Sequence, residues 1–266
     1  MSRSPSSATP EWPLIDTIPA SATIYVDAPS GPYAMLKPIL DGIAATLLLI
    51  PALPIIGICW VLVRLTSSGP GFYCQTRAGL NGRPYRMVKL RTMRHNCERT
   101  SGIVWSVNGD SRITLIGRFL RVTHFDELPQ LFNVLRGEMS LVGPRPERPE
   151  IIRAKGLMDL VPGYEHRLDV RPGVTGIAQV QLPADSDLAS VRHKVAYDLY
   201  AIAHGGFWLD VRVFAATLLK TVGASPELCR RLCRLPSREQ VEEALVDLTQ
   251  PANPCSPAPS GLFQIV

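Results

Sequence analysis

The pattern of hydrophobic and polar positions gives the chain one long apolar run near its N-terminus, residues 39–65, followed by shorter amphipathic segments. The run holds 22 consecutive uncharged residues, enough for a straight helix to span a bilayer. Pro51 and Pro54 lie in its middle, and each removes a backbone hydrogen bond and bends a helix. We therefore expect a re-entrant helix-break-helix over 34–66, which enters one leaflet and turns back. A kinked spanning helix and a buried helix of a soluble protein are the alternatives.

The segments after this run predict a β-hairpin. Residues 71–75 resemble a short strand, and residues 84–93 alternate apolar and basic side chains as a half-exposed strand does. An Asn-Gly pair between them is a strong turn signal. The second strand aims Lys89 and Arg91 either into solvent or into a site. These basic residues therefore form either a solvated face or the rim of a site for an anionic substrate.

The later segments are mainly helical by the spacing of their apolar residues. Asp198 lies off the apolar stripe of one such helix, and a loop punctuated by Gly and Pro at 167–180 leads into a strand. The predicted helices cover residues 112–121, a segment that begins near 126, 149–160, 186–202 and 207–221.

Together these elements predict a mixed α/β fold, mostly helical, with short strands and interfacial amphipathic helices around a compact catalytic domain. We place that domain at 67–222 and expect a disordered or loosely attached tail, rich in Ser, Pro and Ala, at 1–33. A charged extension follows at 223–266. We expect it to be partly disordered, with a short helix before residue 250.

Charge and cysteine content narrow the class of partner. The net charge of +5 favours an anionic partner such as a phospholipid, a nucleotide or a nucleic acid. The six cysteines lack the paired spacing of a zinc site, and we interpret them as reduced thiols in the cytosol. The basic residues are scattered, without interleaved aromatic residues or a recognised nucleic-acid motif, which disfavours a nucleic-acid binder.

The candidate chemistry lies in residues 124–146, HFDELPQLFNVLRGEMSLVGPRP. Pro129 is tolerated only in the first turn of a helix, so Asp126 and Glu127 are expected at a helix N-terminus, which favours ionised carboxylates. An ionised Asp could act as a nucleophile, and an adjacent Glu could hold a divalent metal. Arg145, fixed between two prolines, suits a bidentate phosphate clamp. An acidic helix cap followed by a structural turn fits the same spacing equally well.

The short basic helix before this stretch adds a further candidate. It delivers Arg121 five residues ahead of Asp126, where a guanidinium would pair with the carboxylates or with phosphate. A solvent-exposed basic helix face is the alternative.

A series of motifs resembles the bacterial sugar transferase family, the monotopic phosphoglycosyl transferases. The resemblance runs from about residue 37 to 222, roughly 70% of the chain, and its longest motif is highly specific. We expect the chain to belong to the small class, without the long N-terminal multi-span region of larger relatives. Where the family usually has Ser-Leu before the Asp-Glu pair, this chain has His124 and Phe125. After the proline-broken run, the motifs are QTRAG at 75–79, KLRTM at 89–93, RITLIGRFLR at 112–121, DELPQLFNVLRGEMSLVGPRP at 126–146, RPGVTGIAQV at 171–180 and YDLY at 197–200.

The resemblance implies transfer of a sugar 1-phosphate from a UDP-sugar to a polyprenyl (undecaprenyl) phosphate, with release of UMP. Such a reaction initiates a cell-surface glycan or exopolysaccharide pathway. The resemblance implies that Asp126 is the nucleophile of a covalent aspartyl-phosphosugar intermediate and that Glu127 binds Mg²⁺. The candidate phosphate-binding residues are Arg77, Lys89, Arg91, Arg121, Arg145 and Arg171.

The implied location is the cytoplasmic face of the bacterial inner membrane. Lys37 and Arg64 flank the apolar run without the charge asymmetry that would orient a span. The expected partners are the UDP-sugar, the polyprenyl phosphate, the lipid bilayer, downstream glycosyltransferases and a second copy of the chain. A catalytically weak or silent membrane-bound scaffold of glycan assembly is the rival hypothesis, and His124 is the feature that favours it.

Overall fold

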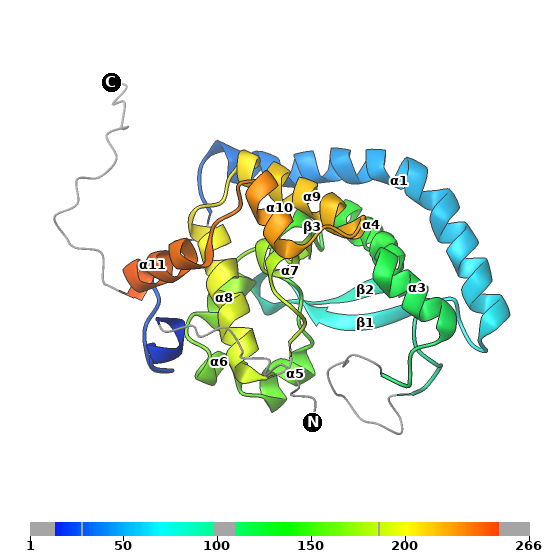
Figure 1. The fold of residues 1–266 in the computed structure, drawn as a ribbon, viewed down its shortest axis with the longest axis horizontal. Coiled ribbons are helices and arrows are strands. Elements are labelled where there is room, and N and C mark those ends of the chain that lie inside the picture. Colours follow the sequence, from blue (N-terminus) through cyan, green and yellow to red (C-terminus); the bar gives the residue numbers. More distant parts are fainter. Residues whose placement is uncertain (1–13, 28, 98–109, 186, 250–266) are drawn as a thin grey trace, which may run out of the picture.

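The computed structural model describes residues 14–27, 29–97, 110–185 and 187–249 as a mostly helical body with two small sheets (Figure 1). The long helix α1 (Pro32–Thr66) arches over one side of this body. The other elements, in chain order, are η1 (Ile15–Thr17), β1 (Phe72–Ala78), η2 (Leu80–Gly82), β2 (Pro84–Leu90), α3 (Leu115–Thr123), η3 (Phe125–Gln130), α4 (Leu131–Leu135), β3 (Ser140–Val142), α5 (Pro149–Ala154), α6 (Leu157–Leu160), η4 (Tyr164–Leu168), β4 (Gly173–Thr175), α7 (Ile177–Gln181), α8 (Leu188–Ala203), α9 (Phe207–Thr221), α10 (Pro226–Leu232) and α11 (Arg238–Thr249).

Helix α1 packs on the body by a single stripe and leaves its other faces apolar and exposed. The stripe contacts α3, α4, η3, β2 and β3. Leu47, Ile50 and Ile58 each expose more than 60% of their surface on the remaining faces. Within the described residues, α1 is the one helix long and apolar enough, by length and composition, to cross a membrane. The buried positions alternate spacings of four and three: Ala45, Leu49, Ala52, Ile56, Cys59 and Val63.

The break that the sequence predicts at Pro51 and Pro54 is wrong, because α1 is continuous through both prolines and bends partway along its length instead (Figure 1). A proline removes one N–H bond and displaces the carbonyl of the preceding turn, which bends a helix without ending it when packing holds both arms. The predicted mixed, mostly helical fold with a long apolar N-terminal helix is otherwise confirmed.

Polar contacts fix both ends of α1 to the body. Near the N-terminal end, the Tyr33 hydroxyl donates to the Asp210 carboxylate of α9, and the Lys37 ammonium pairs with the same carboxylate. Just beyond the C-terminal end, Arg91 Nη2 donates to the Ser67 carbonyl at 2.8 Å. Both ends of the helix therefore lie against one compact body.

The predicted hairpin is confirmed as the antiparallel pair β1–β2, in which Gln75 lies opposite Met87. Asn81 (φ 54°) and Gly82 (φ 69°) form the left-handed turn that an Asn-Gly pair favours. The second sheet is the short parallel pair β3–β4. A Cβ at Gly173 would lie 2.1 Å from the Gly143 nitrogen, so this close approach requires glycine.

Several predicted helices have different boundaries in the structure. α3 begins at Leu115, because the Thr114 hydroxyl caps it by accepting from Gly117 N at 3.0 Å. The helix predicted at 149–160 is two helices, α5 and α6, separated at Gly156, which has φ 59°. The loop predicted at 167–180 contains the short strand β4, and it ends in helix α7 where the sequence predicted that a strand would follow.

The two ends of the described chain also differ from the predicted tails. Ile15 and Ile24 are buried in the core, and η1 packs on α8. Tyr25 N donates to the Leu248 carbonyl of α11 at 2.8 Å, and Val241 of that helix is fully buried. These apolar anchors make residues 14–27 and the two C-terminal helices part of the body. The disorder predicted for 1–13 and 250–266 lies outside the described residues.

Candidate active site

Asp126 and Glu127 lie on η3, a six-residue 3-10 segment between α3 and α4. His124 ends α3 with φ 57° and ψ 15° and turns the chain into η3. His is enriched among the non-glycine residues that adopt this left-handed conformation. Phe125 packs edge to face on Phe119 of α3, with the ring centroids 6.2 Å apart. The His-Phe pair therefore has a structural role at the corner that presents the two carboxylates.

The helical turn begins at Phe125, close to the predicted start near residue 126, but it is too short for the expected dipole effect. A single 3-10 segment followed by the five-residue α4 carries only a small macrodipole. Pro129 fits because it lies within this short turn. The positive potential at the carboxylates must therefore come from side chains.

Basic side chains from two other segments supply that potential. Lys89 Nζ of β2 lies 2.7 Å from Glu127 Oε1, and Arg145 Nη2 lies 3.3 Å from the same oxygen. The side chains of Lys89 and Glu127 are only 15% and 16% exposed, whereas that of Arg145 is 42% exposed. Arg145 therefore reaches from the pair toward solvent, where an anionic ligand could meet it.

The pKa values of the two carboxyl groups shift in opposite directions. Burial, reinforced by the neighbouring Glu127 carboxylate, raises the pKa of Asp126 above its ordinary value of 3.8, against the opposing effect of the nearby cations. Burial also opposes ionisation of Glu127, but Lys89 and Arg145 outweigh it and hold the pKa of Glu127 well below its ordinary value. This arrangement pairs a firmly ionised Glu with a more basic Asp, a division of roles that suits a nucleophile beside a charge-binding group.

Close backbone packing brings Arg121 to the same place. Arg121 is one of the cations that lower the pKa of Asp126. Its Nε donates to the Thr92 hydroxyl at 3.0 Å. α3 can approach this segment because residue 117 is glycine, where a Cβ would lie 2.0 Å from the Thr92 carbonyl oxygen.

Asn133 of α4 fixes the strand that carries Lys89. It is fully buried, its Oδ1 accepts from Val88 N at 3.1 Å, and its Nδ2 donates to the Arg86 carbonyl at 2.8 Å. The amide therefore pins the outer edge of β2 beside η3. Asn133 was not among the predicted site residues. An Asn at an apolar position of a helix is nevertheless a signal, because a buried amide needs hydrogen-bond partners in a neighbouring segment.

The structure brings Asp126, Glu127, Lys89, Arg121 and Arg145 together and places the other three candidate cations elsewhere. Arg77 donates to the Pro146 carbonyl at 3.0 Å, and Arg91 donates to the Ser67 carbonyl. Arg171 donates to the Gly137 carbonyl at 2.9 Å. These three guanidinium groups are committed to backbone contacts.

Comparison with known proteins agrees with the family that the motifs resemble. The family model described as bacterial sugar transferase matches residues 32–224. The chain belongs to the bacterial sugar transferase family. It is 39% identical over 187 residues to the UDP-glucose:undecaprenyl-phosphate glucose-1-phosphate transferase of Caulobacter vibrioides, covering 68% of each chain.

Two other relatives are named for related activities. The sugar transferase chain is 38% identical over 190 residues to the UDP-N-acetylgalactosamine-undecaprenyl-phosphate N-acetylgalactosaminephosphotransferase of Aeromonas hydrophila, covering 71% of this chain and 44% of that one. It is 37% identical over 219 residues to the undecaprenyl-phosphate glucose phosphotransferase of Komagataeibacter xylinus, covering 79% and 40%. The chain thus spans less than half the length of these two relatives.

The donor set of this sugar transferase fits Mg²⁺ in part. Carboxylate oxygens are suitable ligands, and both cations that contact Glu127 end on Oε1. Among the residues the structure describes, no group of three His, Cys, Asp or Glu side chains could hold a metal ion. Mg²⁺ is often bound by one or two carboxylates together with substrate phosphates, so the two carboxylates suit a metal that arrives with a phosphorylated donor.

Proposed function

We propose that this chain transfers a sugar 1-phosphate from a UDP-sugar to undecaprenyl phosphate and releases UMP. One observation carries the proposal: Asp126, which is buried, and Glu127, whose side chain is 16% exposed, are held among cations on η3, and η3 packs directly against the apolar helix α1. A water-soluble anionic donor and a lipid-bound acceptor could use such a site in turn. The names of the relatives make UDP-glucose and UDP-N-acetylgalactosamine the first donors to test.

In the proposed reaction, a carboxylate oxygen of Asp126 attacks the phosphorus that is bonded to the sugar. An Asp–O–P bond forms, the bond to the UMP oxygen breaks, and UMP leaves with that electron pair. A phosphate oxygen of the lipid then attacks the same phosphorus and releases the Asp126 carboxylate. The raised pKa of Asp126 supports this role, because a more basic carboxylate is a better nucleophile while still ionised near neutral pH.

The surrounding residues would stabilise the charge of the pyrophosphate. Arg145 is rigidly placed and part-exposed, so its guanidinium suits bidentate phosphate binding, and Arg121 lies on the Asp126 side of the site. Lys89 holds Glu127 ionised. Glu127 would hold Mg²⁺, which supplies charge neutralisation to the donor phosphates when bound.

The geometry of α1 supports a monotopic, re-entrant arrangement. The helix has 35 residues, about 52 Å at 1.5 Å per residue, which exceeds a hydrocarbon core of about 30 Å. The helix bends partway along its length (Figure 1), and a bend at Pro51 and Pro54 would divide it into arms of 19 residues (32–50) and 12 residues (55–66), about 28 and 18 Å long. The longer arm carries Lys37 and Asp41, so its uncharged part is residues 42–50, about 14 Å, and neither arm offers an uncharged stretch that spans the core.

The polar contacts at the two ends of α1 also support a re-entrant arrangement. Asp210 holds the N-terminal end and Arg91 holds the segment after the C-terminal end, on one body. A helix that crossed the bilayer would place its ends on opposite sides. We therefore assign both ends and the site to the cytoplasmic face, where UDP-sugars are made.

The direct test is UMP release by nanodisc-held protein given undecaprenyl phosphate and a panel of UDP-sugars. The proposal expects release with at least one sugar, and none from Asp126→Asn, whose amide cannot form the acyl phosphate. A wild-type protein that binds the membrane but releases no UMP from any donor would support the silent scaffold instead.

A further inference from the structure

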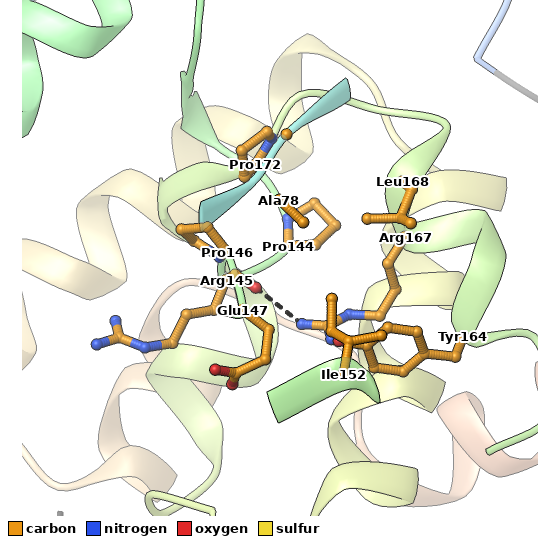
Figure 2. Close-up of a pocket in the computed structure, with 11 residues that line it drawn as sticks. Ala78, Pro144, Arg145, Pro146, Glu147, Ile152, Tyr164, Arg167, Leu168 and Pro172 are labelled. Atoms are coloured by element: carbon orange, nitrogen blue, oxygen red, sulfur yellow. Dashed lines mark hydrogen bonds between the residues drawn. The ribbon is translucent and has the colours of Figure 1, made fainter. Parts of the chain in front are cut away.

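Two partly buried arginines, Arg77 and Arg167, bind the backbone carbonyls of Arg145 and its neighbour Pro146. Arg77 Nη1 donates to the Pro146 carbonyl at 3.0 Å, and Arg167 Nη2 donates to the Arg145 carbonyl at 3.0 Å. Figure 2 shows the second contact as a dashed line, with the Arg145 side chain extending away from Arg167. Two consecutive carbonyls of the Gly143–Pro146 turn are thus fixed from behind, while the guanidinium projects forward to Glu127.

Each arginine has its own carboxylate partner, so neither needs the site for its charge. Arg167 Nε donates to Asp198 Oδ2 at 2.8 Å, and the two side chains are 10% and 3% exposed. Arg77 Nη1 pairs with Glu147 at 3.1 Å, with side chains 15% and 17% exposed. Neutralised guanidinium groups that donate to carbonyls act as rigid supports, because their fork has little freedom to rearrange.

The support is built from distant parts of the chain. Arg167 also lies over the Tyr164 ring, 4.9 Å from its centroid. Tyr164 and Asp198 are both almost fully buried. Asp198 lies on α8, so its burial corrects the expectation that it points away from the apolar stripe: the carboxylate is inside because Arg167 compensates its charge.

We propose that Arg167 and Arg77 are positioning residues, which orient the Arg145 guanidinium toward Glu127 and the donor phosphates by binding the two carbonyls of its turn. The assignment rests on the proposed function for its catalytic consequence. The hydrogen bonds by which the two arginines hold the turn do not depend on that function. A loosened turn would let Arg145 sample orientations in which its fork no longer matches a phosphate.

The kinetic test is a double-mutant cycle on UMP release. Arg167→Lys should lower kcat/KM for the UDP-sugar about tenfold, mainly through KM, because lysine cannot bind Asp198 and the Arg145 carbonyl together. In an Arg145→Ala background the same change should alter kcat/KM by less than about twofold. A purely structural role would give the same loss in both backgrounds and would overturn the proposal.

A matched control separates this contact from a general loss of arginine–carbonyl bonds. Arg192, also on the body, donates to the carbonyls of Ile18 and Leu160 at 3.4 and 3.1 Å, remote from the turn. Arg192→Lys should leave kcat/KM within about twofold. A loss as large as that of Arg167→Lys would show that any such bond matters equally, against the proposal.

Hydrogen exchange measured by mass spectrometry tests the turn without catalysis. In Arg167→Lys, a peptide covering 140–148 should exchange about tenfold faster, while one covering the 72–90 hairpin stays unchanged. If the wild type transfers no sugar, the proposed function fails and this measurement still decides whether the turn is held. Unchanged exchange at 140–148 would overturn the assignment. If Arg167→Lys does not fold, Arg77→Lys is measured against the same prediction.

Discussion

Replacing Lys89 with Gln should move the acid limb of the pH–rate profile to higher pH. Lys89 Nζ lies 2.7 Å from Glu127 Oε1 in a largely buried pair, and Lys89 lowers the pKa of both Glu127 and Asp126. An opposite charge at this range lowers a carboxyl pKa by about 1–3 units. Because Arg145 and Arg121 remain, we expect the loss of Lys89 to raise the pKa of Asp126 by the low end of this range, about one unit.

The rate on the acid side should fall, because only the ionised carboxylate of Asp126 can attack the phosphorus. Losing Lys89 raises the pKa of Asp126, so a smaller fraction of the nucleophile is ionised at any pH near that pKa. On the acid side, kcat/KM for the UDP-sugar should fall about tenfold relative to wild type, and the difference should vanish on the plateau where both are fully ionised. The effect is therefore a displaced limb rather than a uniform loss.

The assay is kcat/KM for UMP release from about pH 5 to 9 in nanodiscs. Arg86→Gln is the matched control, because it removes one positive charge from the exposed face of the same strand. Arg86→Gln should leave the limb in place, and Lys89→Arg should restore it. A Lys89→Gln protein that folds and keeps the wild-type limb would refute the claim that Lys89 sets the ionisation of the pair.

The remaining predictions concern phosphate binding, metal binding and topology. Arg145→Lys should raise the donor KM about tenfold despite keeping the charge, because lysine loses the bidentate fork; an unchanged KM would make Arg145 structural. Glu127→Gln should shift the Mg²⁺ titration of UMP release to higher concentration, since an amide is a poorer ligand for a hard cation; an unchanged titration would place the ligand elsewhere. Replacing Pro51 and Pro54 with Leu should straighten α1 and move the N-terminus across the membrane, which a cysteine at Ser30 would report in intact cells through labelling by a membrane-impermeant reagent. Labelling already present without the proline changes would contradict the re-entrant arrangement.

Local signals in the sequence predicted several elements well. The Asn-Gly pair and the alternating flanks predicted the β1–β2 hairpin, because turn chemistry and period-two patterning act within a few residues. The apolar spacing predicted the bounds of α9 at Phe207–Thr221. The Asp-Glu pair and Arg145 were singled out by their motif, and the structure places them in contact range of one another.

Tertiary contacts decided the rest, which a single sequence does not reveal. We interpreted Pro51 and Pro54 as a helix break, but α1 continues through both. Packing along the stripe from Ala45 to Val63 holds the helix together. Ile15 and Ile24 looked like part of a polar tail, yet a few buried apolar side chains suffice to attach a segment. The partition of the arginines into those at the site and those that support the backbone depends on partners up to 70 positions away, such as Glu147 for Arg77.

The most direct test of the central claim is the mass of the protein after a donor is supplied without acceptor. Nanodisc-held protein incubated with Mg²⁺ and a UDP-sugar should gain the mass of one sugar phosphate, release one equivalent of UMP, and carry the adduct on the peptide that contains Asp126. Adding undecaprenyl phosphate should then remove the adduct. UMP release that always requires the acceptor, with no adduct at Asp126, would contradict the covalent mechanism.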